Sequence, residues 1–295
     1  MRERLASPRI ALAVAVVAIS TSAILIRWSE APPVVAAFYR VLFTTVLLAP
    51  LTVGRHRNTL GDLSTRHLLA AGVTGLALAA HFGTWFESLS WTSVAASVTL
   101  VQSQPIFVVA GAWLVLDERV TRRTVAGVAV ALVGMVGMSL GDFLSGTAVG
   151  PRPLYGNALA VLGALTAAGY VLAGRSLRQR LPLLPYVTVV YGVAAAALGA
   201  VVLAQGHPLT GYEHREWGLF LAMAIGPGIL GHTLVNWSLA HVESSLVSVT
   251  LLGEPLGSAL LALVLLTEVP SPWTVGGGAV VLAGIVVTAR GRPDG

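Results

Sequence analysis

One carboxylate stands inside an otherwise apolar run of the sequence. Residues 251–267 read LLGEPLGSALLALVLLT, in which Glu254 directly precedes Pro255. Inserting a carboxylate into hydrocarbon costs roughly 2.5–3.5 kcal/mol on insertion scales, so this group is expected to contact water, a partner group or a ligand. Two interpretations are open. Glu254 either lines a cavity, where it binds the cationic part of a ligand or carries a proton, or stays protonated and hydrogen-bonds a neighbouring helix.

Other polar and aromatic side chains in apolar runs are candidates for the same site. On a helix, His81 and Trp85 lie one turn apart on one face, as do His232 and Asn236. Aromatic rings with a few polar groups are typical of a small-molecule cavity, although such residues also serve to hold helices together. The predicted substrate-binding residues are His81, Trp85, Gln102, Gln104, Tyr170, His232, Asn236 and Glu254. No metal site is predicted.

Proline and glycine interrupt three of these apolar runs. A proline removes one backbone hydrogen bond from a helix, which frees the carbonyl four residues earlier. For the runs that contain Gln104 and Glu254, the freed carbonyls would be those of Val101 and Leu251, and each needs another donor, such as water or a substrate. The predicted hinge positions are Pro105, Gly226, Pro227, Gly228 and Pro255.

The composition shows what kind of molecule positions these residues. Of 295 residues, 55% are hydrophobic and 11% are charged, and the mean hydropathy is +0.80, which is too apolar for a soluble domain of this length. All 18 basic residues are Arg, dispersed along the chain, so a nucleic-acid groove is not predicted. Cysteine is absent, which excludes disulfides and thiolate chemistry.

The apolar runs predict an all-α polytopic membrane protein. A helix of about 20 apolar residues crosses the hydrocarbon core. The ten predicted spans are residues 9–27, 33–54, 66–88, 93–116, 123–140, 155–174, 182–204, 217–238, 243–266 and 273–289. Fourteen Arg residues fall on the side of the N-terminus and three, Arg27, Arg152 and Arg215, on the other side. The cytoplasmic loops of membrane proteins are enriched in Arg and Lys, so both termini are predicted to lie in the cytoplasm. The predicted location of the protein is the cell membrane.

The two halves of the chain repeat each other. Residues 105–136 and 255–286 align at an offset of 150 with twelve identical pairs of 32. The pairs include Pro105/Pro255, Glu118/Glu268, Gly127/Gly277 and Gly134/Gly284. Since five spans is an odd number, the second copy is inverted in the membrane, as in many secondary transporters. The predicted organisation is two inverted five-helix repeats, 1–140 and 155–295, joined by a linker at 141–154. Glu118 and Glu268 each close a span and are expected to cap the next helix.

These features resemble the EamA branch of the drug/metabolite transporter superfamily. The residues that carry the resemblance are LVQSQPIFVVAGAWLVLDE, LLGEPLGSALLALVLLTE and FYR at residues 38–40. The resemblance implies a ten-helix protein whose central cavity is lined by spans 1, 3, 4, 6, 8 and 9. The family includes exporters of amino acids, aromatic ones among them, and of other metabolites. Arg40, in span 2, resembles a structural family position, although it could also snorkel, pair with a carboxylate or bind an anion.

The leading functional hypothesis is a secondary transporter, an exporter by resemblance, of small metabolites or drug-like molecules. The expected partners are the lipid bilayer and a small-molecule substrate, with a proton as candidate co-substrate and the monomer as the working state. No cofactor is predicted. The alternatives are a polytopic membrane enzyme and a channel or lipid-handling protein. HExxH and P-loop motifs are missing, which disfavours a metalloprotease and an ATPase. A channel would favour rings of like residues from several subunits.

Overall fold

The computed structural model describes residues 7–92, 97, 100–144, 151–266 and 272–290, and these residues form helices and no strand. The first half contains α1 (Pro8–Trp28), α2 (Pro33–Gly61), α3 (Thr65–Trp91), α5 (Gln104–Val115) and α6 (Arg122–Leu144). The second half contains α7 (Pro153–Arg178), α8 (Leu183–Ala204), α9 (His214–Met223), η1 (Ala224–Thr233), α10 (Leu234–Ser238), α11 (Ser244–Leu251), α12 (Glu254–Leu266) and α13 (Pro272–Arg290).

Helix starts follow local signals in the sequence. Proline occupies the first turn of α1, α2, α5 and α7, where its missing N–H would have no partner in any case. Ser64 caps α3, because its side chain accepts a hydrogen bond from the backbone N–H of His67 at 3.3 Å. The loops therefore break the chain at the same places where the apolar runs end.

The helices have the length and surface of membrane spans. Seven helical segments among the described residues are long and apolar enough to cross a bilayer, and shorter apolar helices lie at Gln104–Val115 and Val275–Thr288. Large apolar side chains point outward, such as Leu114 at 68% exposure and Val264 at 74%. The chain is thus an all-α, multi-pass membrane protein, as predicted, while the full count of ten spans stays a prediction.

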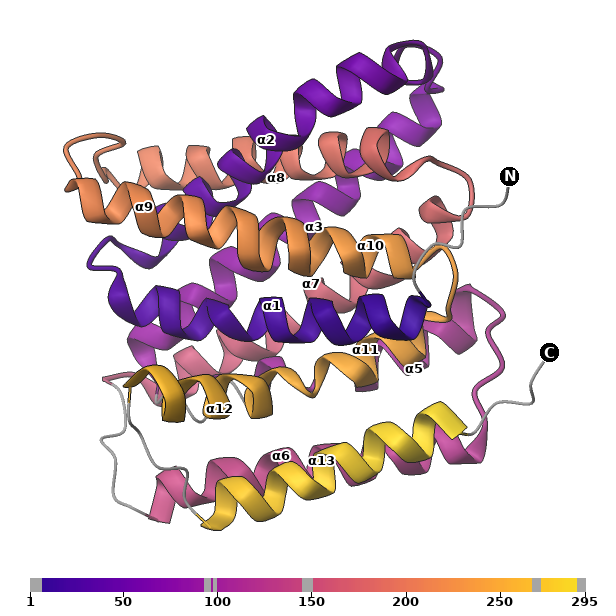
Figure 1. The fold of residues 1–295 in the computed structure, drawn as a ribbon, viewed down its shortest axis with the longest axis vertical. Helices are drawn as coiled ribbons and strands as arrows, with labels where there is room; N and C mark the ends of the chain where they lie inside the picture. The colour runs from indigo at the N-terminus through magenta and orange to yellow at the C-terminus, as the bar shows by residue number, and fades with distance from the viewer. Residues whose placement is uncertain (1–6, 93–96, 98–99, 145–150, 267–271, 291–295) are drawn as a thin grey trace.

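The packing of the helices follows a two-fold pattern between the halves. Helix α3 packs along α7, and the segments that correspond to them in the other repeat, α9 to α10 and α1, pack along each other in the same way. Likewise α5 lies on α7 as α12 lies on α1, while α2 pairs with α8 and α6 with α13. Helix α1 begins and α13 ends at the same end of the bundle (Figure 1).

The pair α6 and α13 depends on glycine for close contact. A Cβ placed on Gly134 would lie 2.6 Å from the Gly277 carbonyl oxygen, and one on Gly284 would lie 2.6 Å from the Gly127 carbonyl oxygen. Small residues allow the backbones of membrane helices to approach closely. Van der Waals packing then drives their association, because the hydrophobic effect does not act between helices in lipid. The four glycines that matched between the repeats therefore meet one another at a single helix interface.

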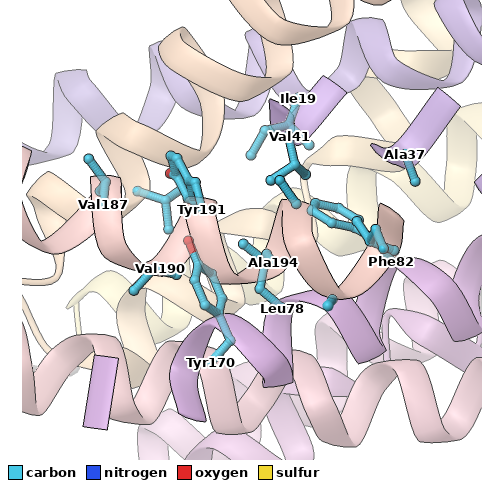
Figure 2. Packing of buried hydrophobic residues seen from close by; sticks show 14 of the residues in the cluster. Ile19, Ala37, Val41, Leu78, Phe82, Tyr170, Val187, Val190, Tyr191 and Ala194 are labelled. Atoms are coloured by element: carbon cyan, nitrogen blue, oxygen red, sulfur yellow. The ribbon is translucent and has the colours of Figure 1, made fainter. Parts of the chain in front are cut away.

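The largest apolar cluster lies mainly between α1, α2, α3, α7 and α8, and it also includes buried residues of α5, α9, α10 and α11. Leu78 and Phe82 of α3 pack near Val41 of α2, while Tyr170 of α7 and Tyr191 of α8 lie together in the same cluster (Figure 2). The Tyr170 hydroxyl points toward Tyr191 in this view. This cluster forms the wall against which the polar residues of the candidate site are placed.

Candidate functional site

The eighth span departs from α-helix at its centre. Residues Ala224–Thr233, which include the Gly226-Pro227-Gly228 sequence, form a π-helix between α9 and α10. Two backbone carbonyls in this segment accept hydrogen bonds from side-chain hydroxyl groups. Thr44 Oγ1 donates to the Ala224 carbonyl at 3.2 Å, and Thr233 Oγ1 donates to the Gly228 carbonyl at 3.2 Å. π-Helical turns are rare and occur often at functional sites. The break brings His232 of η1 toward α2 and α3.

Spans 4 and 9 are divided into separate helices. Helix α5 begins at Gln104 and α12 begins at Glu254, so Pro105 and Pro255 lie in the first turn of a new helix. The free carbonyls expected at Val101 and Leu251 stay a prediction, but each span was predicted as one continuous helix and is divided instead. The physical reason is that the first helical turn accepts proline without losing a hydrogen bond, whereas the interior of a helix does not.

The two division points meet across the repeats. The Gln102 side-chain amide donates to Oε2 of Glu254 at 3.2 Å, while Ser20 Oγ of α1 donates to the Glu254 backbone carbonyl at 3.1 Å. Ser258 Oγ donates in turn to the Ser20 carbonyl at 3.1 Å. Gln102 is 8% exposed, and Glu254 is partly exposed. Gln104 is buried at the first residue of α5. The structure therefore joins the two predicted residues Gln102 and Glu254 directly.

A second polar group joins α7, α8 and α10. Asn236 Nδ2 lies 2.5 Å from the Tyr170 hydroxyl, 3.1 Å from the Tyr191 hydroxyl and 2.8 Å from the His232 carbonyl oxygen. Asn236 is fully buried, and its Oδ1 atom has no hydrogen-bond partner among the described residues. Tyr170 and Asn236 thus fix helices to one another, and their network ends beside His232.

A small cavity of about 10 Å³, with room for about one water molecule, lies next to this network. Its walls are Arg40, Val41, Thr44, Leu78, Phe82, Tyr191, Gly228 and His232. The sequence analysis did not select Phe82, Tyr191 or Thr44, and it expected span 2 to lie away from the cavity. Tyr191 could have been selected from the sequence, because it matches Tyr39 in the first repeat. Phe82 could not have been selected, since nothing in an apolar run distinguishes one Phe from another.

His81 and Trp85 of α3 face α7 and do not line this cavity. The two rings are stacked, with centroids 5.8 Å apart and an angle of 14° between their planes. His81 Nδ1 donates to the Gly163 carbonyl oxygen at 3.0 Å. Trp85 Nε1 is buried and has no hydrogen-bond partner among the residues that the structure describes. His81 is therefore held by the backbone of α7, while the buried Nε1 atom of Trp85 is an unused donor.

A polar cluster lies at one end of the bundle. Glu118 Oε1 accepts from Arg175 Nε at 3.1 Å and from the Ser244 backbone N–H at 3.1 Å. Arg175 also donates to the Leu239 carbonyl at 2.9 Å. The cluster lies at the end of the bundle where α1 begins and α13 ends.

This cluster corrects the expectation for Glu118. Its side chain caps α11 of the second repeat and not the next helix, because Thr121 Oγ1 already accepts from the Thr124 N–H at the start of α6. Glu268 lies outside the described residues.

Known proteins share both the sequence pattern and the fold. A protein of Archaeoglobus fulgidus described as an uncharacterized transporter is 27% identical over 264 residues, which cover 88% of this chain and 90% of that protein. The pseudopaline exporter CntI of Pseudomonas aeruginosa is 27% identical over 223 residues, or 76% of this chain and 74% of that protein. One solved structure has a TM-score of 0.80 at 22% identity, covers 96% of each chain and supports the fold alone. The model of the EamA-like transporter family matches residues 8–140 and 154–290. The chain belongs to the EamA-like transporter family.

Proposed function

We propose that this transporter exports small metabolites or drug-like molecules by alternating access around a cavity near the membrane midplane. The observation that carries the proposal is the hydrogen bond between Gln102 and Glu254, which joins the divided spans 4 and 9 of the two repeats. Divided helices with polar groups at their breaks are typical of substrate sites in secondary transporters. The export direction is supported by the similarity to a protein named as an exporter.

The residues proposed to bind substrate are those predicted from the sequence, with Glu254 as the central group. Glu254 begins α12, where a carboxylate also stabilises its own helix. A helix cap would be equally satisfied by an amide oxygen, so the ionisable group points to a cationic substrate part or a coupling proton. The closed cluster around Glu118 is proposed to be the cytoplasmic gate, in keeping with cytoplasmic termini.

The polar bonds of this gate join two groups of helices that also contact each other directly. Glu118 and Arg175 belong to the segments around α5 and α7, while Leu239 and Ser244 belong to α10 and α11. Opening this end of the bundle requires these bonds to break, and closing it restores them. Rocking of one group against the other around a fixed site is how inverted-repeat transporters work.

The test is solute flux in proteoliposomes made from the purified protein. We expect saturable uptake of at least one member of a metabolite panel, acceleration of labelled uptake by unlabelled solute on the opposite side, and a response to an imposed proton gradient. Protein-free liposomes are the control. Chemical conversion of a solute would favour the enzyme, and flux that never saturates and shows no counterflow would favour a channel.

A further inference from the structure

A groove of about 340 Å³ lies between α3 and α8 and shares no lining residue with the cavity beside His232. Leu76 and Ala80 of α3 belong to one wall, and Ala197 and Val201 of α8 belong to the other. Leu76 is 53% exposed and Val201 is 40% exposed, so the groove opens on the lipid-facing surface of the bundle. Its volume is at the lower end of the range for small-molecule pockets, about 300–1,000 Å³.

Gly83 of α3 keeps this groove open. A Cβ built on Gly83 would meet only Leu198 Cδ2, at 3.9 Å, which is ordinary van der Waals contact. On the same helix, a Cβ on Gly75 would lie 2.5 Å from the Val190 carbonyl oxygen. Helix packing therefore requires glycine at Gly75 but not at Gly83. Since glycine is unfavourable inside a helix relative to alanine, the feature that Gly83 contributes is open space.

One end of the groove is polar. Glu87 follows Gly83 by one turn on the same face of α3, and Gln205 of α8 lines the same groove. Glu87 Oε1 accepts from Trp91 Nε1 at 2.7 Å, whereas Glu87 Oε2 has no hydrogen-bond partner among the described residues. The Trp91 ring lies edge-on to Tyr155, with centroids 5.5 Å apart. Because Trp and Tyr gather at the level of the lipid head groups, Glu87 lies where the apolar groove meets that level.

The bilayer supplies the occupant of the apolar part. A buried water needs about 2–4 polar partners, and the side chains of Leu76, Ala80, Ala197 and Val201 provide none. An empty apolar gap loses dispersion contacts along its lining, and an acyl chain restores them. The groove is therefore suited to hydrocarbon and not to water.

The polar end selects the head group. The free oxygen of Glu87 favours a group that is positively charged and donates hydrogen bonds, because charge-assisted hydrogen bonds are the strong ones. A primary ammonium has both properties. A quaternary ammonium has no N–H to donate, and the head group of an anionic lipid brings a second negative charge beside Glu87.

We propose that this groove is a binding site for phosphatidylethanolamine, with one acyl chain beside Gly83 and the ammonium group on Glu87 Oε2. The site is separate from the proposed substrate cavity. It lies on the helix that also carries His81 and Trp85, which face α7.

The first test measures which head group is retained. The purified protein is equilibrated with equal amounts of phosphatidylethanolamine and phosphatidylcholine that have identical acyl chains, and the adducts with one lipid are quantified by native mass spectrometry. We expect wild type to retain phosphatidylethanolamine about threefold to tenfold more than phosphatidylcholine. Glu87→Gln should still bind one lipid but lose this preference. Phosphatidylglycerol with the same chains should bind no better than phosphatidylcholine.

The second test fills the groove. Gly83→Leu should lose the retained lipid. Gly72→Leu is the matched control, because Gly72 lies on the same face of α3 and a Cβ there also meets nothing within 4 Å, but Gly72 does not line the groove. That variant should keep the lipid. Ala197→Leu fills the groove from α8 and should act like Gly83→Leu, so it replaces Gly83→Leu if that variant does not fold.

Three results would overturn the proposal. One is a wild-type protein that retains no lipid, and another is a wild-type protein that retains phosphatidylcholine or phosphatidylglycerol as well as phosphatidylethanolamine. The third is a folded Gly83→Leu or Ala197→Leu protein that retains as much lipid as Gly72→Leu. Lipid retention is measured without transport, so none of these results depends on the proposed substrate site.

Discussion

The contact between α6 and α13 gives a sharp prediction about the scaffold. We expect Gly134→Ala to destabilise the protein and Gly276→Ala on the facing helix to leave it unchanged or slightly more stable. A Cβ on Gly134 would meet backbone atoms, the Gly277 carbonyl oxygen and the Val281 nitrogen, each at 2.6 Å. Backbone atoms cannot rotate away, so the two helices must separate. A Cβ on Gly276 meets nothing within 4 Å.

The magnitude follows from two opposing terms. Replacing Gly by Ala in a helix gains up to about 1 kcal/mol in helix propensity at either position. Overpacking a close contact costs about 1–3 kcal/mol, and only Gly134→Ala incurs that cost. The two variants should therefore differ by about 1–3 kcal/mol in the free energy of unfolding, measured by denaturant titration in mixed micelles. Equal stability of both variants would refute the close packing of α6 on α13.

Three further predictions concern topology, the aromatic pair and the closed end. Cysteines introduced at Ser145, which lies outside the described residues, and at Gly211 should react with an impermeant thiol reagent outside intact cells, while cysteines at Asn58 and Ser176 should not; labelling of the second pair would reverse the orientation. Trp85→Ala should reduce flux severalfold with near-normal abundance in the membrane, and a loss of folded protein in proportion to flux would instead indicate packing. Glu118→Gln should lower the free energy of unfolding by about 1–3 kcal/mol, because the charge-assisted bonds to Arg175 and Ser244 are weakened. The control Glu213→Gln, at an exposed position, should leave it unchanged. Equal effects of the two changes would argue against the gate cluster.

The fold could be predicted because its signals are local. Runs of apolar residues, prolines at helix starts and matched glycines in the two repeats place most helices within a few residues of where they lie. Helix α2 is an exception, because it continues to Gly61, beyond the predicted end at residue 54. The division of the spans at Gln104 and Glu254 was harder to predict from the sequence. A proline inside an apolar run predicts a disturbance, but the sequence does not say whether the helix bends or ends and begins again.

The candidate site was harder to predict because a membrane helix is apolar on every side. The hydrophobic pattern that orients a helix in a soluble protein is then weak, so the direction in which Arg40 or Phe82 points is set by packing with distant helices. Pairs on one helix, such as His81 with Trp85, were predictable from spacing. The contact of Gln102 with Glu254 was not, because it joins residues 152 positions apart.

The bond between Gln102 and Glu254 is the centre of the proposed mechanism, and Glu254→Gln tests it most directly. The change is nearly isosteric and reproduces the neutral residue that the first repeat has at Gln104, so the protein should fold and reach the membrane in normal amounts. Flux of an identified substrate into proteoliposomes should fall at least about tenfold, as expected when a charge-assisted contact is lost, or should lose its dependence on pH if Glu254 carries a proton. Wild-type flux with an unchanged pH profile in Glu254→Gln would contradict the account.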